Sequence, residues 1–304
     1  MNAIEIKNLT KIFPGGKKAV DNVTLSIPQG EFFALLGPNG AGKTTIINIL
    51  TDLVQMTEGE VKVFGESISE NHTYIKSLIG IVPQEFNFGI FDTLIEIVVI
   101  QAGYYGIKRK DALVRAEEVL KKLSLWEKRN DQARTLSGGM KRRLMIARAL
   151  MHDPKILILD EPTAGVDVEL RREMWVFLEE LNKKGVTILL TTHYLEEAEQ
   201  LCKNMAVIQN GKVIARGAIK DLLSNQEIQT FVVDAKKEVT KEVLSKLKAF
   251  TPVYVDTKTF EVVVGGTASL PTLFVLLQEI GIEATGIRPK SNRLEEFFIK
   301  LTQK

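Results

Sequence analysis

The stretch Gly37-Pro38-Asn39-Gly40-Ala41-Gly42-Lys43-Thr44 matches the pattern G-x-x-x-x-G-K-[ST], between a strand-like run at 31–36 and a helix-like run at 45–50. Strand, glycine loop and helix in this order form the arrangement that cradles the phosphates of a nucleotide. Glycines let the loop curl so that successive N–H groups point inward, and the helix N-terminus adds positive charge. The alternative is a glycine turn that merely precedes an ordinary helix.

Two side chains at the end of this loop have separate expected tasks. Lys43 is long enough to reach the β- and γ-phosphates, and the hydroxyl of Thr44 can bind Mg²⁺. The sequence therefore predicts a nucleoside triphosphate and its magnesium ion at one site.

An acidic pair follows the apolar run Ile156-Leu157-Ile158-Leu159. Four consecutive aliphatic residues favour a parallel strand buried on both faces, and such strands present polar residues to ligands at their carboxyl ends. We expect Asp160 to hold Mg²⁺, through water, and Glu161 to act as general base for the attacking water. The alternative is a pair of carboxylates that only caps a strand end.

Two further polar residues, Gln84 and His193, each end another apolar run. Gln84 is expected to contact Mg²⁺ or the attacking water. A single histidine is more often structural, but His193 ends a strand at the same predicted sheet edge as Asp160. We therefore expect His193 to contact the γ-phosphate.

The tetrapeptide Leu136-Ser137-Gly138-Gly139 precedes a helical run at 140–151. Ser137 is a natural helix N-cap, and the two glycines leave backbone N–H groups exposed. Taken alone, this is a helix start, but it also makes a second anion site. Because the glycine loop already binds one side of a nucleotide, the second site is expected to close over the nucleotide of a partner molecule.

In this order the motifs resemble those of the nucleotide-binding subunit of an ABC transporter, over residues 1 to about 218. They correspond to Walker A at 37–44, the Q-loop at Gln84, the signature at 136–139, Walker B through Glu161, the D-loop Ala164-Gly165-Val166-Asp167 and the switch at His193. The resemblance implies an α/β P-loop NTPase with a RecA-like core, an antiparallel β subdomain and a helical subdomain at about 88–152. It also implies ATP hydrolysis, with ATP and Mg²⁺ bound.

The same resemblance implies a set of nucleotide-binding residues. Phe13 fits the family's aromatic position that stacks on adenine, and its alternative is a place at the edge of the core. The nucleotide-binding residues expected are Phe13, Gly37, Pro38, Asn39, Gly40, Ala41, Gly42, Lys43, Thr44, Thr45, Ser137, Gly138 and Gly139. The expected metal-binding residues are Thr44, Gln84 and Asp160, and the expected catalytic residues are Glu161, His193 and Gln84.

Details of the motifs resemble ATPases of ABC-2-type exporters. Met140 stands where many relatives have Gln, and the D-loop reads Ala-Gly-Val-Asp. We therefore expect an exporter ATPase, with import as the alternative. The resemblance implies an integral-membrane permease partner and an ATP-dependent homodimer. The aromatic segment after Gln84 is expected to receive a helix of the permease, with core packing as its alternative.

Composition agrees with a cytosolic protein that has no affinity for nucleic acid. The net charge is +2, and Cys202 is the only cysteine, which precludes a disulfide within the chain. No run of about 18 apolar residues is present, so the transport path is expected in another polypeptide, with this chain at the cytoplasmic face of the membrane. The clusters Lys108-Arg109-Lys110 and Lys141-Arg142-Arg143 are expected on solvated helix faces.

Two functions of other classes were weighed. A soluble ABC-type ATPase acting on DNA or ribosomes is disfavoured, because no long coiled coil fits between Gln84 and Leu136 and each motif occurs once. A regulator without turnover is disfavoured because Asp160 and Glu161 are both present. Residues 219–304 are expected to form a small α+β domain, of ferredoxin-like order, with a role in regulation or dimer contact as a hypothesis.

Overall fold

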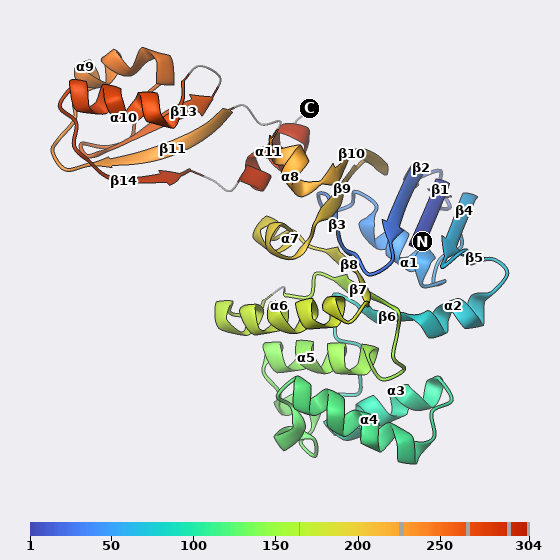
Figure 1. The fold of residues 1–304 in the computed structure, drawn as a ribbon. Coiled ribbons are helices and arrows are strands. Elements are labelled where there is room, and N and C mark those ends of the chain that lie inside the picture. Colours follow the sequence, from blue (N-terminus) through green and yellow to red (C-terminus); the bar gives the residue numbers. More distant parts are fainter. Residues whose placement is uncertain (164, 225–227, 266–267, 291–292, 303–304) are drawn as a thin grey trace. The chain divides into compact units, whose positions relative to one another are not determined.

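The computed structural model describes residues 1–163, 165–224, 228–265, 268–290 and 293–302. The chain divides into two compact units, Met1–Ala218 and Ile219–Lys304, and each is described by itself (Figure 1). None of the helices in the described ranges combines the length and the apolar character needed to cross a membrane.

A six-stranded sheet forms the centre of the first unit, in the order β10-β9-β3-β8-β7-β6. All its strands run parallel except β10, which is antiparallel to β9. β3, β7 and β8 are buried at every position, as expected of parallel strands covered on both faces. Because the parallel strands end at one edge, the residues that follow β3, β6, β7 and β8 meet there. The bounds are β3 (Phe32–Leu36), β6 (Ile79–Val82), β7 (Ile156–Asp160), β8 (Thr187–Thr191), β9 (Asn204–Gln209) and β10 (Lys212–Ala218).

An antiparallel sheet of four strands, in the order β2-β1-β4-β5, packs against this core. Most of β2 alternates between buried and exposed positions, which is typical of a sheet with one face turned to water. The buried face shares one hydrophobic core with the helix after β3, through side chains such as Ile6, Val63 and Ile46. The bounds are β1 (Asn2–Ile12), β2 (Lys18–Pro28), β4 (Glu58–Val63) and β5 (Glu66–Ser67).

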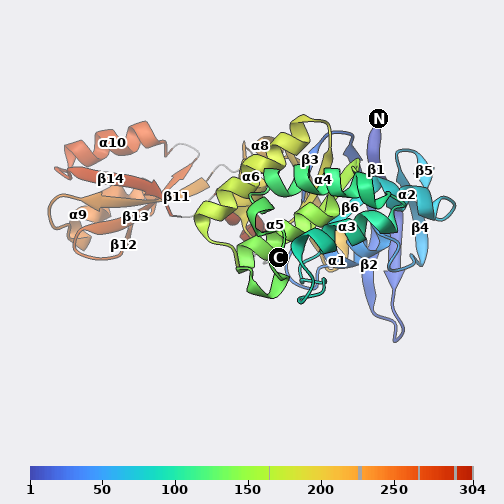
Figure 2. The same ribbon diagram turned by 90° about the horizontal axis from the view of Figure 1, so that it is seen from below.

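Seven α-helices are described in the first unit. Three of them, α3, α4 and α5, group together on one side of the unit, in green in Figure 1. α5 lies beside α6 in both views (Figures 1 and 2), and an ion pair between Arg143 and Glu173 joins them. The bounds are α1 (Lys43–Leu50), α2 (His72–Leu78), α3 (Leu94–Tyr104), α4 (Arg109–Lys122), α5 (Gly138–Ala149), α6 (Val168–Lys183) and α7 (Leu195–Leu201), with short 3-10 turns at Trp126–Lys128 and Ala133–Thr135.

The second unit contains an antiparallel sheet in the order β12-β13-β11-β14. The chain runs β11, α9, β12, β13, α10, β14, so the strand pairs joined by each helix are split by another strand, which is the ferredoxin-like order expected. α9 and α10 cover one face of the sheet and close its core (Figure 1). The bounds are α8 (Ile219–Ser224), β11 (Ile228–Ala235), α9 (Lys241–Leu244), a 3-10 turn (Ser245–Phe250), β12 (Val253–Tyr254), β13 (Thr259–Gly265), α10 (Leu270–Glu279), β14 (Ala284–Pro289) and α11 (Arg293–Thr302).

Candidate functional site

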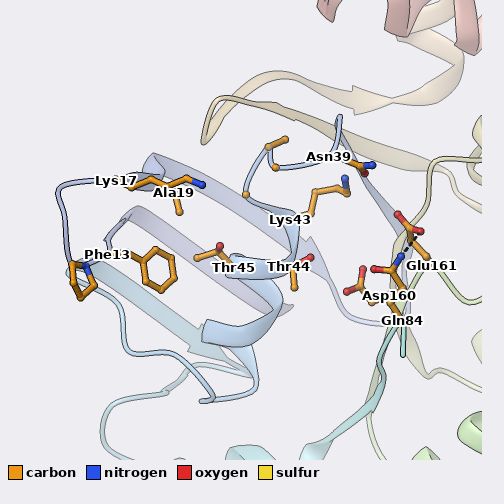
Figure 3. A pocket seen from close by; sticks show the side chains of 14 residues that line it. Phe13, Lys17, Ala19, Asn39, Lys43, Thr44, Thr45, Gln84, Asp160 and Glu161 are labelled. Atoms are coloured by element: carbon orange, nitrogen blue, oxygen red, sulfur yellow. Dashed lines mark hydrogen bonds between the residues drawn. The ribbon is translucent and has the colours of Figure 1, made fainter. Parts of the chain in front are cut away.

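A cavity of about 410 Å³ lies between the glycine loop and the residues that follow β6 and β7 (Figure 3). Its size is that of a small-molecule site. It is lined by Phe13, Pro14, Lys17, Ala19, Asn39, Gly40, Ala41, Gly42, Lys43, Thr44, Thr45, Gln84, Asp160 and Glu161. Most of the residues expected from the sequence to bind nucleotide therefore face one space, although they come from distant parts of the chain.

The backbone of the loop requires glycine at three positions, and at Gly37 an added Cβ would lie 2.3 Å from the carbonyl oxygen of Ile208. Gly42 caps α1 at a φ of 112°, and a Cβ added there would lie 2.5 Å from the carbonyl oxygen of Ala19 on β2. Gly40 has a φ of 79° but faces open space. The loop thus curls tightly over the start of α1 and lies directly against β2.

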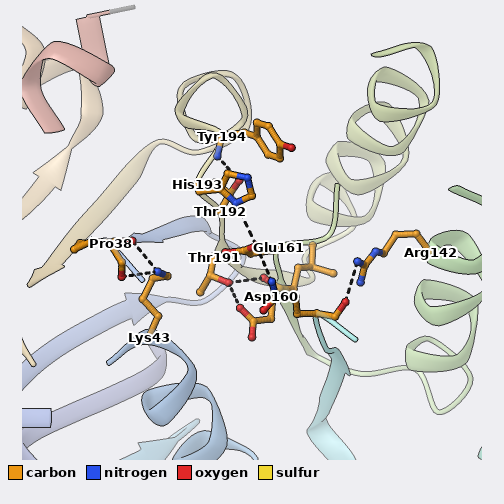
Figure 4. Close-up of polar contacts among 12 residues, drawn as sticks. Pro38, Lys43, Arg142, Asp160, Glu161, Thr191, Thr192, His193 and Tyr194 are labelled. Carbon is orange, nitrogen blue, oxygen red and sulfur yellow. Dashed lines mark hydrogen bonds and ion pairs between the residues drawn. The ribbon is translucent and has the colours of Figure 1, made fainter. Parts of the chain in front are cut away.

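The side chain of Lys43 folds back over the preceding residues of its own loop. Its Nζ donates to the carbonyl oxygens of Gly37 at 2.7 Å and Pro38 at 3.2 Å (Figure 4). Burial lowers the pKa of the Lys43 ammonium, while the carboxylates of Glu161 and Asp160 oppose this shift. Its positive charge therefore lies at the cavity, between the loop carbonyls and the acidic pair.

Gln84 and His193 both contact the carboxylate of Glu161. Its Oε2 accepts a hydrogen bond from Nε2 of Gln84 at 3.1 Å (Figure 3) and lies 3.2 Å from Nδ1 of His193 (Figure 4). Its backbone has a φ of 50°, in the left-handed region that non-glycine residues rarely adopt. Strain of this kind persists where the surrounding structure holds it, and it concentrates at functional sites. The expected base is thus in direct contact with Gln84 and His193, a contact that the sequence did not predict.

Asp160 is held by a different neighbour, Thr191 at the end of β8, whose hydroxyl donates to Oδ1 (Figure 4). Burial raises the pKa of Asp160, and this hydrogen bond opposes the rise. Sequence reasoning missed Thr191, although it immediately precedes the Thr192-His193 pair at the same strand end. The carboxylate is fixed at the sheet edge with its charge turned towards the cavity.

The predicted adenine-stacking residue lies at the opposite end of the cavity. Phe13 follows β1 and lines the cavity together with Pro14 and Lys17 (Figure 3). The ammonium of Lys11 lies 5.1 Å from the centroid of its ring. Phe13 is therefore partly exposed and faces the cavity instead of the core, as base stacking requires.

The signature segment does not line this cavity. Ser137 is the N-cap of α5, as predicted, and its hydroxyl accepts from the N–H of Met140 at 3.3 Å. Ser137 and Gly138 are exposed, whereas Gly139 is buried against Leu170. The signature segment, predicted to be a second anion site, is therefore not part of this cavity within one chain. Ala164 of the D-loop lies outside the described residues, and Asp167 caps α6.

The prediction that Lys141-Arg142-Arg143 lies on a solvated face is wrong for the two arginines, which are 3% and 8% exposed. Arg142 donates to the backbone carbonyls of Pro83 and Gln84, and Arg143 to Glu173 (Figure 4 shows Arg142). The apolar run Leu144-Met145-Ile146-Ala147 that follows was the missed signal, because a helix that is apolar on several sides is buried over most of its surface.

These residues fit a nucleotide with one magnesium ion. The Thr44 hydroxyl and the Asp160 carboxylate both face the cavity and are oxygen donors of the kind Mg²⁺ prefers. In the part of the chain that the structure describes, no group of three or more His, Cys, Asp or Glu could hold a metal by itself. A magnesium ion bound by one carboxylate normally takes its remaining ligands from phosphate and water.

Comparison with known proteins agrees with this site. The family model described as "ABC transporter" matches residues 20–164. The chain is 37% identical over 302 residues to the Nod factor export ATP-binding protein I of Cupriavidus metallidurans, covering 98% of this chain and 97% of that protein. The chain belongs to the ATP-binding proteins of ABC transporters.

Two further similarities extend this result. The linearmycin resistance ATP-binding protein LnrL of Bacillus subtilis is 41% identical over 221 residues, covering 73% of this chain and 71% of that protein. A dimeric cassette solved in a post-hydrolysis state with ADP and Pi aligns with a TM-score of 0.65 and 30% identity, covering 71% of this chain and 98% of that one. This ABC transporter subunit therefore binds and hydrolyses ATP, on the α/β P-loop fold that the sequence predicted.

Proposed function

We propose that this subunit drives an exporter: two copies close over two ATP·Mg²⁺ complexes and thereby move a separate membrane permease. The support is the similarity to two proteins named for export and for resistance, together with the Met140 and D-loop variants. The observation that carries the proposal is the convergence of Gln84 and His193 on one oxygen of Glu161, across the cavity from Lys43.

Binding is the task of the loop side of the cavity. The inward N–H groups of residues 37–44 and the Lys43 ammonium neutralise the triphosphate, and the ring of Phe13 stacks on the base. Thr44 and Asp160 hold Mg²⁺, which supplies charge neutralisation at the phosphates when bound. These interactions fix the γ-phosphate at the edge where Glu161 lies.

Hydrolysis is the task of the opposite side. Glu161 accepts the proton of the attacking water, which makes that water a better nucleophile. Gln84 and His193 hold the Glu161 carboxylate in place, and each can turn to a water or a phosphate oxygen when these enter. The burial of Glu161 excludes bulk water and strengthens these contacts.

Closure of two copies explains the separate signature segment. The exposed N–H groups at Ser137 and Gly138 point to an anion outside their own chain, because their own cavity does not include them. A second copy presenting its glycine loop would supply the γ-phosphate that this helix N-terminus binds. A symmetric homodimer satisfies both sites at once.

The proposed permease contact lies beside Gln84. Phe86, Phe91 and Tyr104 are 44%, 65% and 80% exposed, so core packing, the alternative weighed from the sequence, does not account for them. Exposed aromatic side chains of this kind suit an amphipathic helix of a membrane partner. This contact would place the subunit on the cytoplasmic side of the membrane.

The size of the Glu161→Gln protein with and without ATP·Mg²⁺, measured by light scattering, tests the dimer. We expect monomer without nucleotide and dimer with it. Adding Ser137→Ala should abolish the dimer, whereas adding Ser269→Ala should leave it, because Ser269 caps α10 in the second unit through the same kind of hydrogen bond. A Glu161→Gln protein that stays monomeric at saturating ATP contradicts the homodimer.

A further inference from the structure

Arg142 occupies an unusual place for a charged residue. It is 3% exposed and lies on α5, whose N-cap is Ser137. Its two terminal nitrogens donate to two consecutive backbone carbonyls, of Pro83 at 2.9 Å and of Gln84 at 3.0 Å. The guanidinium carbon also lies 5.1 Å from the centroid of the Phe86 ring. One side chain thus contacts three residues of the segment that follows β6, namely Pro83, Gln84 and Phe86.

That segment carries the glutamine of the site. The side-chain amide of Gln84 donates to Oε2 of Glu161 (Figure 3), while the backbone carbonyl of the same residue accepts from Arg142. Burial lowers the pKa of the Arg142 guanidinium, and the carboxylates of Asp160 and Glu161 oppose that shift, so its charge also acts on the acidic pair. Arg142 is therefore connected to the Glu161 carboxylate through Gln84 and does not contact it directly.

The neighbouring arginine shows what a purely structural role looks like. Arg143 is also buried, but it donates to Glu173 on α6 and to the carbonyl of Leu123. Those contacts join helices and do not reach the cavity. Arg142 bonds instead to two adjacent carbonyls, a geometry that the planar fork of arginine matches and the single ammonium of lysine does not.

We propose that Arg142 is a positioning residue that links the signature helix to the hydrolytic centre of its own chain. A helix turns as one body, so displacement of Ser137 when it binds a partner's nucleotide displaces Arg142, and Arg142 sets Gln84 against Glu161. The inference rests on the proposed function, in which Ser137 meets the γ-phosphate of a second copy. On this inference, hydrolysis would proceed only after closure has set Gln84 against Glu161.

The first test compares turnover and ATP affinity in the full-length chain for Arg142→Gln, Arg142→Lys and Arg143→Gln. Misplacing a reacting group by about 1 Å can lower a rate about 10²-fold. We expect kcat to fall about 10- to 100-fold in Arg142→Gln and less in Arg142→Lys, with ATP affinity changed by less than about threefold. Arg143→Gln should lower the melting temperature while kcat of the folded protein stays near wild type.

A double-mutant cycle with Gln84→Ala isolates the link. If Arg142 acts through Gln84, the double variant loses no more turnover than Gln84→Ala alone, because coupled residues are not additive. Effects that multiply overturn the inference. Should Arg142→Gln fail to fold, Arg142→Lys carries the same cycle, since lysine preserves the charge.

ATP-dependent dimerisation distinguishes a positioning role from a packing defect in α5, because only a packing defect would prevent the dimer. The Glu161→Gln/Arg142→Gln protein should still dimerise with ATP, because its nucleotide and signature sites are intact. Loss of that dimer assigns Arg142 to the shape of α5 and overturns the inference. If Gln84→Ala and Glu161→Gln themselves retain wild-type turnover, the proposed function is what has failed; if both lose turnover and Arg142→Gln does not, only the inference has failed.

Discussion

The glycine loop and the cluster around Glu161 face the same cavity but are built in opposite ways. The loop is eight consecutive residues shaped by glycine backbone and closed by the bonds of Lys43 to its own carbonyls. The cluster is assembled from the ends of β6, β7 and β8 and is braced from α5. The loop is one contiguous segment that packs against β2, whereas the side-chain contacts of Glu161 join it to separate elements.

This difference separates binding from turnover. A contiguous loop of this kind, with the start of α1, can bind phosphates whatever the position of α5. A cluster collected from several elements is sensitive to small shifts of any of them, so hydrolysis can be controlled by movement of a distant helix. The comparison predicts that substitutions in the glycine loop weaken ATP binding, whereas substitutions in the cluster around Glu161 reduce turnover.

The largest difference is expected between Lys43→Ala and Glu161→Gln. Lys43→Ala should lose ATP binding and turnover together, because the ammonium that neutralises the phosphates is gone. Glu161→Gln should lose about 10²–10⁴-fold in kcat, the usual share of a general base, while ATP affinity is retained. Steady-state kinetics and fluorescence titration with a labelled nucleotide measure both quantities. Wild-type turnover of Glu161→Gln would contradict the role of base.

Two substitutions in the loop should reduce the stability of the chain by different amounts. Gly42→Ala should destabilise the chain by about 3 kcal/mol or more, because a Cβ there meets the Ala19 carbonyl and the φ of 112° suits only glycine. Gly40→Ala should cost only about 1–2 kcal/mol, since its Cβ enters open space and only the positive φ is strained. Urea unfolding of the two variants measures this difference. Equal costs would mean that the contact with β2 does not constrain the loop.

The same contrast explains what the sequence could predict. The loop, the strand ends at Asp160 and Glu161, and the Ser137 cap follow from contiguous patterns, and the fold class that they indicated is confirmed. Thr191 and Arg142 were missed because their partners, Asp160 and Gln84, are 31 and 58 residues away along the chain. A burial pattern read along one helix cannot show which loop a buried arginine grips.

Phe13, at the other end of the cavity, is expected to affect ATP binding and not turnover. Stacking of a base on an aromatic ring contributes about 1–3 kcal/mol, so Phe13→Ala should weaken ATP binding by about 5- to 150-fold with kcat at saturation nearly unchanged. Phe13→Tyr keeps the ring and should bind as wild type. Calorimetric titration with ATP and with triphosphate alone checks the assignment. An equal loss for triphosphate would show that Phe13 shapes the loop and does not stack on the base.

The smallest expected effect concerns the stability of the acidic side without nucleotide. Burial raises the pKa of Asp160, so its charged form is disfavoured in the folded state. Because the folded chain holds this proton more tightly than the unfolded chain, the stability from protonation is present at low pH and is lost as pH rises through the folded pKa. At pH 7.5 Asp160→Asn should therefore raise the free energy of unfolding by about 0.5–2 kcal/mol while abolishing Mg²⁺-dependent hydrolysis.

The pH dependence of that gain distinguishes charge from packing. The advantage of Asp160→Asn over wild type should shrink as pH is lowered towards the ordinary carboxyl range, because wild-type Asp160 then takes up its proton and becomes neutral as well. Thr191→Val is the matched control: it removes the hydrogen bond that opposes the raised pKa and should destabilise the chain most at high pH, where Asp160 is charged. An advantage of Asp160→Asn that stays constant with pH would show that its cause is packing around the amide. In that case the buried charge of Asp160 would not lower the free energy of unfolding, and its neighbours in the fold would stabilise it fully.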